Sequence, residues 1–211
     1  MNRQRTKKVQ RLLGAVCLAG IALTGCESVS LNQNKLEAAR NFVPIRAGYL
    51  CCNLYTDGFW VSDINYRDTD KQLLAAGTPV SLTAYGRQRV GFTVEGQSAG
   101  QYLGNDYSRD LTQQAFARRY IVSEDPRPEI ATYPVMIQAA IKSAKVMRGM
   151  TEDQVIMALG WPVTSENPDR SADLWRYWLS SSREFQIVFD QQRRVDSIRA
   201  DKQTAQTVIY R

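Results

Sequence analysis

The chain contains no histidine, and this absence removes several kinds of chemistry at once. It excludes a Ser-His-Asp or Cys-His nucleophile, an imidazole general base near neutral pH and a histidine-ligated zinc. Carboxylates, Lys or Tyr could still catalyse a reaction, but the sequence has no paired-acid motif. The residue types therefore disfavour an enzyme, and we expect no catalytic residue, no cofactor and no metal site.

Four cysteines remain as reactive side chains: Cys17, Cys26 and the adjacent pair Cys51 and Cys52. The pair lacks the Cys-x-x-Cys spacing of redox and zinc sites, and no other soft ligand supports a metal. Two structural roles stay open for it. Neighbouring side chains of a strand point to opposite faces, so the two could be small buried thiols, or they could form a vicinal disulfide.

The first 25 residues have the three zones of a secretory signal peptide. Basic residues end at Arg11, an apolar stretch covers residues 12–23, and two small residues follow. The apolar stretch is too short to span a bilayer comfortably. The run Leu23-Thr24-Gly25-Cys26 then resembles the bacterial lipobox. The resemblance implies that Cys26 carries acyl chains of the palmitate type and becomes the first residue of the mature protein.

This address has consequences for localisation and for the cysteines. In lipoproteins with this motif an Asp after the Cys favours the inner membrane, so Glu27 points to the outer membrane, with the periplasmic face as the default. Cys17 would leave with the signal peptide, and Cys26 would carry lipid. Only Cys51 and Cys52 would then be exposed to the oxidising periplasm.

The net charge of +6 does not indicate a nucleic-acid partner. The first 25 residues hold five basic residues and no acidic one, which leaves 22 basic against 21 acidic residues over the other 186. A nearly neutral body lacks the positive surface that phosphate-backbone binding requires. We therefore expect no nucleic acid among the partners.

Composition shifts divide the mature chain. Residues 26–44 are polar and predict a lipidated tether, and residues 45–122 predict a small antiparallel β domain with the texture of an SH3-like or partly open barrel. Its β-branched and aromatic runs predict strands at Tyr49–Tyr55, Phe59–Tyr66, Pro79–Tyr85 and Arg89–Glu95. A helix is predicted over Asp110–Tyr120. Residues 123–134 contain two prolines among charges and predict an extended linker.

Residues 135–203 predict a second, α+β domain, followed by a tail at 204–211. An amphipathic helix is predicted over Val135–Met147. Next comes a short helix with both ends specified, because Thr151 and Gln154 can form a capping box and Gly160 with Pro162 can end the helix.

This pattern, Gly149-Met150-Thr151-x-x-x-Val155-x-x-x-Leu159-Gly160-x-Pro162, resembles the BamE/SmpA-type (OmlA-like) domain of outer-membrane lipoproteins. The next segments resemble that family as well: Leu174–Trp178 stands where the family has a Trp-x-Tyr strand, and Phe185–Phe189 and Val195–Ile198 come after it as further strands. The resemblance covers about residues 135–200. It implies two helices packed on a three-stranded antiparallel meander, and a binding role instead of catalysis.

Two departures from the family pattern matter. The turn at residues 190–193 lacks the glycine that the family usually has, and the region Ile45–Tyr120 is absent from the single-domain member of the assembly machinery. The resemblance therefore implies an interaction module and names no particular partner.

A candidate interaction surface follows from strand alternation. Trp175 and Tyr177 share one face and are expected in the core, whereas Trp178 points the other way beside Arg176. Arg118 and Arg119 form a second basic position on the predicted helix.

Together these features predict a non-enzymatic lipoprotein of the outer membrane that faces the periplasm. It would act as a scaffold or assembly factor, with the membrane and one or more envelope proteins as partners. The alternative is a sensor or inhibitor that binds a soluble periplasmic ligand, such as an enzyme, a peptidoglycan fragment or a stress signal.

Overall fold

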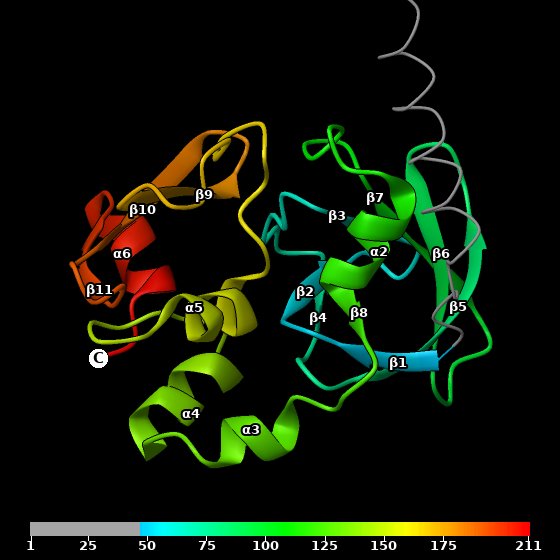
Figure 1. The fold of residues 1–211 in the computed structure, drawn as a ribbon, viewed down its shortest axis with the longest axis horizontal. Coiled ribbons are helices and arrows are strands. Elements are labelled where there is room, and N and C mark those ends of the chain that lie inside the picture. Colours follow the sequence, from blue (N-terminus) through cyan, green and yellow to red (C-terminus); the bar gives the residue numbers. More distant parts are fainter. Residues whose placement is uncertain (1–46) are drawn as a thin grey trace, which may run out of the picture. The chain divides into compact units, whose positions relative to one another are not determined.

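The computed structural model describes residues 47–211, which belong to one compact unit. This part of the chain is a mixed α+β structure with an eight-stranded sheet, a three-stranded sheet and five helices (Figure 1). The expected α+β class is therefore confirmed at this level. The predicted signal peptide (1–25) and tether (26–44) lie outside the described residues.

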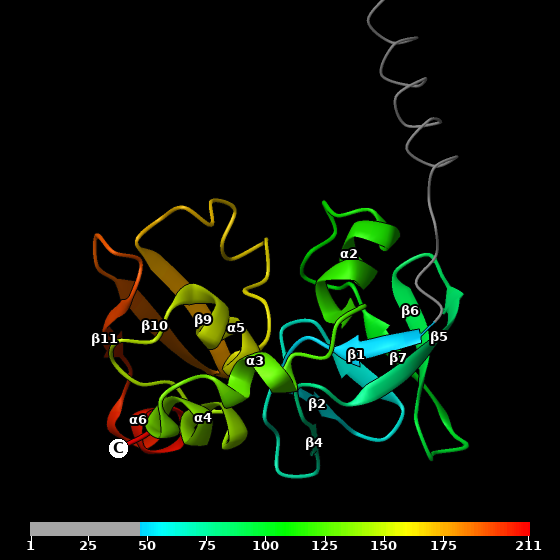
Figure 2. The same ribbon diagram turned by 60° about the horizontal axis from the view of Figure 1, so that its bottom comes forward.

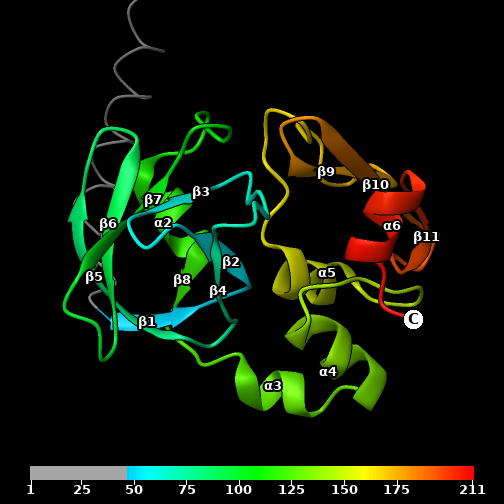
Figure 3. The same ribbon diagram turned by 180° about the vertical axis from the view of Figure 1, so that it is seen from behind.

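The larger sheet consists of short strands in the order β4-β2-β3-β7-β6-β5-β1-β8. The strands are β1 (Ala47–Leu50), β2 (Leu54–Thr56), β3 (Trp60–Ser62), β4 (Gln72–Leu74), β5 (Pro79–Tyr85), β6 (Arg89–Val94), β7 (Gly100–Gly104) and β8 (Ile121–Val122). Neighbours pair antiparallel, except that β3 and β7 run parallel side by side (Figure 3). The sheet curls, and helix α2 (Gln113–Tyr120) covers one open end of the curl (Figures 1 and 2).

The predicted strands of this region are confirmed at two of four places. β5 has the predicted bounds, and β6 ends one residue before the predicted strand. The single strand predicted over Tyr49–Tyr55 is wrong, because a bend at Cys51 and Cys52 separates β1 from β2. The strand predicted over Phe59–Tyr66 shortens to β3, since Asn65 adopts a left-handed backbone (φ 58°) that extended structure does not tolerate.

Three strands, β4, β7 and β8, were not predicted from the sequence, and β7 shows the reason. It begins and ends with glycine, which weakens a strand pattern in sequence. Its last residue packs under an indole: a Cβ on Gly104 would lie 2.1 Å from Cζ2 of Trp60. Here glycine permits the close approach of β3 and β7, which only the folded structure reveals.

The rest of the described chain forms a second layer of helices and strands. Its elements are α3 (Arg127–Ala131), α4 (Val135–Lys142), α5 (Glu152–Leu159), β9 (Leu174–Ser180), β10 (Arg183–Phe189), β11 (Val195–Arg199) and α6 (Lys202–Val208). The three strands form an antiparallel meander in the order β11-β10-β9, and α5 lies across one of its faces (Figure 2).

Strand alternation places the core of this layer as predicted. Along β9, Trp175, Tyr177 and Leu179 are buried while their neighbours are half-buried. Val155 and Leu159 of α5 are buried too, and all five belong to one continuous hydrophobic cluster that also includes residues of the curled sheet. The expected core role of Trp175 and Tyr177 is confirmed.

The ends of α5 are also confirmed. The Thr151 hydroxyl accepts a hydrogen bond from the Gln154 backbone N–H, and the Gln154 side chain accepts one from the Thr151 N–H at 2.9 Å. Gly160 ends the helix with φ 87°, a conformation that favours glycine. Local signals were sufficient here because both ends are specified by neighbours in sequence.

Two other predicted helix bounds were wrong. α2 begins at Gln113 instead of Asp110, because the Thr112 hydroxyl accepts a hydrogen bond from the Ala115 N–H and caps the helix there. α4 ends at Lys142 instead of Met147. The Ser143 hydroxyl donates to the Ala139 carbonyl, and Ala144 turns left-handed (φ 52°), which releases the chain from the helix.

The predicted linker and tail are both structured. Within 123–134, Pro126 and Pro128 stand at the start of α3, where a missing N–H costs no hydrogen bond. Within 204–211, most residues belong to α6 or follow it in a backbone pairing: Ile209 bridges Val146, and the Tyr210 N–H donates to the Val146 carbonyl at 2.8 Å. The last ten residues are thus part of the fold.

Candidate functional site

Cys26, the predicted lipidation site, lies outside the described residues, and its acylation stays a prediction. Within the described residues, no helix has the length and apolar composition needed to cross a bilayer. No three Cys, Asp or Glu side chains of residues 47–211 group closely enough to hold a metal ion.

Cys51 and Cys52 form a disulfide bond in the bend between β1 and β2. The Cys52 side chain is fully buried and that of Cys51 is half-buried. The Cys51 N–H donates to the carbonyl of Tyr120, at the end of α2, at 2.9 Å. The bonded pair therefore fixes the bend between β1 and β2, directly before Asn53.

Asn53 is the first of two buried asparagines that join the curled sheet to helices α4 and α5. Its side-chain amide donates to the carbonyl of Ile141 at 2.6 Å and to that of Ala158 at 3.2 Å. Its side-chain oxygen accepts from the Ala76 N–H at 3.0 Å. Only 1% of Asn53 is exposed, so these hydrogen bonds are shielded from solvent.

Asn65 is the second. Its side-chain amide donates to the carbonyl of Leu159 at 2.7 Å, and its oxygen accepts from the Tyr55 N–H at 2.8 Å. Both asparagines satisfy carbonyls near the end of α5 that the helix itself leaves without a partner. The two predicted domains are therefore in direct, buried contact.

Asp63 is a buried acid two residues before Asn65. Its carboxylate accepts hydrogen bonds from the backbone N–H groups of Asp106 and Tyr107 and from the Ser108 hydroxyl. Burial raises the pKa of the Asp63 carboxyl to about 6, against the opposing effect of these hydrogen bonds. Since only 1% of the residue is exposed, its position suits fixing the 105–108 loop better than meeting a substrate.

The predicted surface on β9 is present, but its positive charge is largely compensated by acidic neighbours. The Arg176 guanidinium pairs with Glu166 and with Glu184, each at 3.5 Å. Trp178 stands opposite Glu184 in the register of β9 and β10, and it is half-buried. Its indole N–H is buried without an acceptor among the described residues. Arg176 and Trp178 are therefore brought together, but the charge of Arg176 is compensated.

The two arginines predicted on α2, Arg118 and Arg119, lie apart from the surface on β9. Arg118 is exposed, whereas Arg119 is half-buried with its guanidinium over the ring of Trp161, 5.1 Å from the centroid. The Arg119 carbonyl accepts a hydrogen bond from the Trp161 indole N–H at 2.7 Å. Trp161 stands between Gly160 and Pro162, so its residue type and its place at a fixed turn mark it in the sequence as a surface candidate. Its partner on α2 could not have been found.

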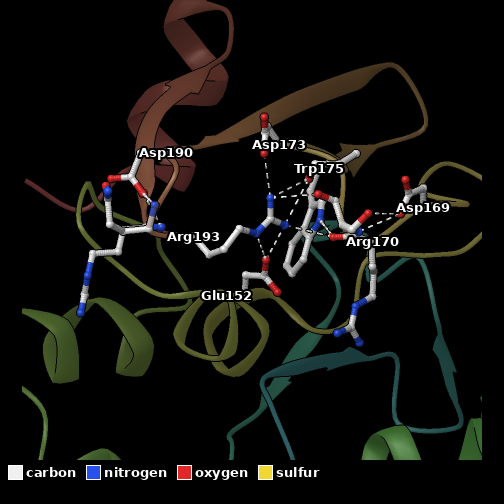
Figure 4. A network of polar contacts seen from close by, with 11 residues as sticks. Glu152, Asp169, Arg170, Asp173, Trp175, Asp190 and Arg193 are labelled. Carbon is white, nitrogen blue, oxygen red and sulfur yellow. Dashed lines mark hydrogen bonds and ion pairs between the residues drawn. The ribbon is translucent and has the colours of Figure 1, made fainter.

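Arg193 organises the opposite end of α5 (Figure 4). Its guanidinium pairs with Glu152 and with Asp173, the latter at 3.0 Å, and donates to the carbonyls of Arg170, Ser171 and Ala172. Its backbone is left-handed (φ 57°), at the turn where the family pattern usually has glycine. The ion pairs and hydrogen bonds offset this strained conformation.

No family model matches the chain, and comparisons with curated proteins and with solved structures found no match either. The resemblance carried by residues 149–198 therefore stays a prediction. The lipobox-like motif and the surfaces described above are the features that bear on function.

Proposed function

We propose that the chain is a lipoprotein of the bacterial outer membrane that faces the periplasm and acts as a non-enzymatic scaffold or assembly factor for an envelope protein complex. The single observation that carries this proposal is the run Leu23-Thr24-Gly25-Cys26 directly after a basic segment and a short apolar stretch. Basic segment, apolar stretch, small residues and Cys stand in the order that lipoprotein processing requires.

The mechanism is tethering. Acyl chains on Cys26 contribute about 0.8 kcal/mol per buried methylene, and two or more chains hold a protein on a membrane stably. Confinement to one surface raises the effective concentration of the folded body near a partner on the same surface. Binding can then be productive even when the contact itself is weak.

The folded body supports a binding role. Two helices, α4 and α5, precede the meander β9–β11, which is the order implied by the resemblance to BamE/SmpA-type domains. Asp63, an acid whose pKa burial raises, is enclosed within the folded body. The remaining distinctive groups are half-buried aromatic and arginine side chains, which are common in interfaces.

The test is Cys26→Ser in the full chain, with Cys17→Ser as the matched control, because Cys17 precedes the cleavage site. We expect Cys26→Ser to move the protein from the outer-membrane fraction to the soluble periplasm, and intact mass to lose the acyl chains. Cys17→Ser should change neither. Retention of Cys26→Ser in the outer membrane would overturn the tether.

Gentle detergent extraction separates the scaffold from the sensor or inhibitor alternative. A scaffold should elute in a large complex of defined partners. Elution as a single chain would instead favour a soluble ligand.

A further inference from the structure

The ring of Trp161 contacts two arginines that come from different parts of the chain. Arg119 stands at the end of α2, and Arg170 lies in the loop before β9. Their guanidinium carbons are 5.1 Å and 4.8 Å from the Trp161 ring centroid. The indole N–H is occupied by the Arg119 carbonyl, so the orientation of the ring is fixed. We call these three residues the Arg–Trp–Arg cluster.

Neither guanidinium of the cluster has a hydrogen-bond acceptor or an ion-pair partner among residues 47–211. Nη1 of Arg119 is buried and unpartnered. Figure 4 shows the side chain of Arg170 pointing away from the Arg193 network, to which Arg170 contributes only its carbonyl. Four other arginines of the described chain are paired with acids: Arg127, Arg148, Arg176 and Arg193.

The cluster therefore carries more positive charge than the fold compensates. Burial lowers the pKa of the Arg119 guanidinium, and the positive charge of Arg170 lowers it further. A buried donor without an acceptor costs free energy, and so does the repulsion of two like charges. An anion that accepts hydrogen bonds from both guanidiniums would relieve both.

Asp110 limits the charge of that anion. Its carboxylate is near enough to raise the pKa of Arg119, and it also accepts a hydrogen bond from the Thr164 hydroxyl. Two guanidiniums against one carboxylate leave a single positive charge. This balance suits a monoanion better than a phosphate dianion, which Asp110 would repel.

We propose that Arg119 and Arg170 bind a carboxylate presented by the protein partner, beside the ring of Trp161. Arginine donates to a carboxylate through two parallel N–H groups, and Trp and Arg are enriched among residues that dominate interface energies. Arg170 is exposed and Trp161 half-buried, so a partner side chain can reach the cluster. The inference rests on the proposed binding role and names the chemistry of its contact.

The test uses the full lipidated protein in a neutral detergent at low salt. The probe is a fluorescein-labelled peptide of five glutamates, followed by fluorescence anisotropy, with the same labelled peptide of five glutamines as reference. We expect saturable binding of the glutamate peptide and at least tenfold weaker binding of the glutamine peptide. Arg119→Gln and Arg170→Gln should each weaken the glutamate peptide roughly tenfold, as expected for loss of charge-assisted hydrogen bonds.

The matched control is Arg148→Gln, which removes an exposed arginine already paired with Asp196 and should leave binding unchanged. Arg170 is exposed, so Arg170→Gln keeps the test valid even where Arg119→Gln perturbs α2. Equal loss in all three variants, or no loss at Arg119 and Arg170, overturns the proposal. So does displacement of the peptide by inorganic phosphate at a tenfold lower concentration than by acetate.

This readout is independent of localisation. If the Cys26→Ser protein is soluble and still binds the glutamate peptide through Arg119 and Arg170, the inference about the cluster stands. If the protein is membrane-anchored but binds the glutamate and glutamine peptides equally, the tether proposal stands and the inference about the cluster is wrong.

Discussion

The side-chain amide of Asn65 donates to the backbone carbonyl of Asn53 at 3.0 Å, and each asparagine also binds a carbonyl of α5. The curled sheet and the helical layer therefore share hydrogen bonds that are shielded from water. Buried amides of this kind fix one relative arrangement, because any other would leave several polar groups without partners.

Asn53→Ala should lower the free energy of unfolding by about 3 kcal/mol, since two buried groups and one half-buried group lose their partners. They are the carbonyls of Ile141 and Ala158 and the N–H of Ala76. Urea denaturation followed by far-UV circular dichroism measures the change. Gln192→Ala, at an exposed turn, is the control and should cost less than about 0.5 kcal/mol. A similar cost for both variants would contradict the role of Asn53.

The pKa of about 6 for Asp63 predicts a pH dependence of stability. Because the folded state raises this pKa above its ordinary value of 3.8, protonation of Asp63 stabilises the fold at low pH, and this contribution is lost as pH rises through about 6. Asp63→Asn removes the effect. The stability of Asp63→Asn relative to the parent should therefore be higher at pH 7.5 than at pH 4.5 by about 2 kcal/mol.

Chemical denaturation at the two pH values measures this difference, and Asp196→Asn is the control because Asp196 is exposed. A difference of the opposite sign would show that hydrogen bonds outweigh burial at Asp63.

The disulfide between Cys51 and Cys52 should contribute little stability although it lies in the core region. A bond between neighbours closes a minimal loop, so the loss of chain entropy that it imposes on the unfolded state is worth only about 1 kcal/mol. Thiol titration of the denatured, lipidated mature protein should find no free thiol before reduction and two after. Thermal unfolding with and without reductant measures the stability change, and complete unfolding on reduction would contradict this prediction.

Arg193→Ala should lower the free energy of unfolding by about 3 kcal/mol, because Glu152 loses its partly buried ion-pair partner. Arg193→Gly should cost about 1 kcal/mol less than Arg193→Ala, since glycine accepts the left-handed backbone at φ 57° without strain. Arg199→Ala, at an exposed position of β11, serves as the control. An alanine variant as stable as the glycine variant would show that the backbone at this turn is unstrained.

The sequence predicted those parts of the fold whose causes are local. The capping box at Thr151, the helix end at Gly160 and the alternation of Trp175 and Tyr177 all depend on residues within a few positions of each other. The structured 204–211 segment was missed for the opposite reason. Ile209 forms a backbone bridge with Val146, more than sixty residues earlier, and no local sequence pattern predicts that pairing.

The same distinction applies to the candidate sites. Arg118, Arg119, Arg176 and Trp178 were identified by residue type, but the aromatic partner of Arg119 comes from a remote segment. Arg176 proved to be paired with acids, whereas Arg119 meets Trp161 and Arg170. Whether the charge of an arginine is compensated depends on tertiary contacts. The sequence could therefore identify these arginines but could not show which of them keep an uncompensated charge.

The backbone pairing between Val146 and Ile209 also constrains the order in which the molecule can be completed. The Val146 N–H donates to the Val208 carbonyl at 2.9 Å, and the Val208 side chain is fully buried. While residues 208–210 are still inside the ribosome or a translocation channel, the core beneath α6 stays open. The part of the fold formed by residues 127–211 can therefore be completed only after residues 208–210 have emerged. A chaperone that holds the emerging chain would have to release these residues last.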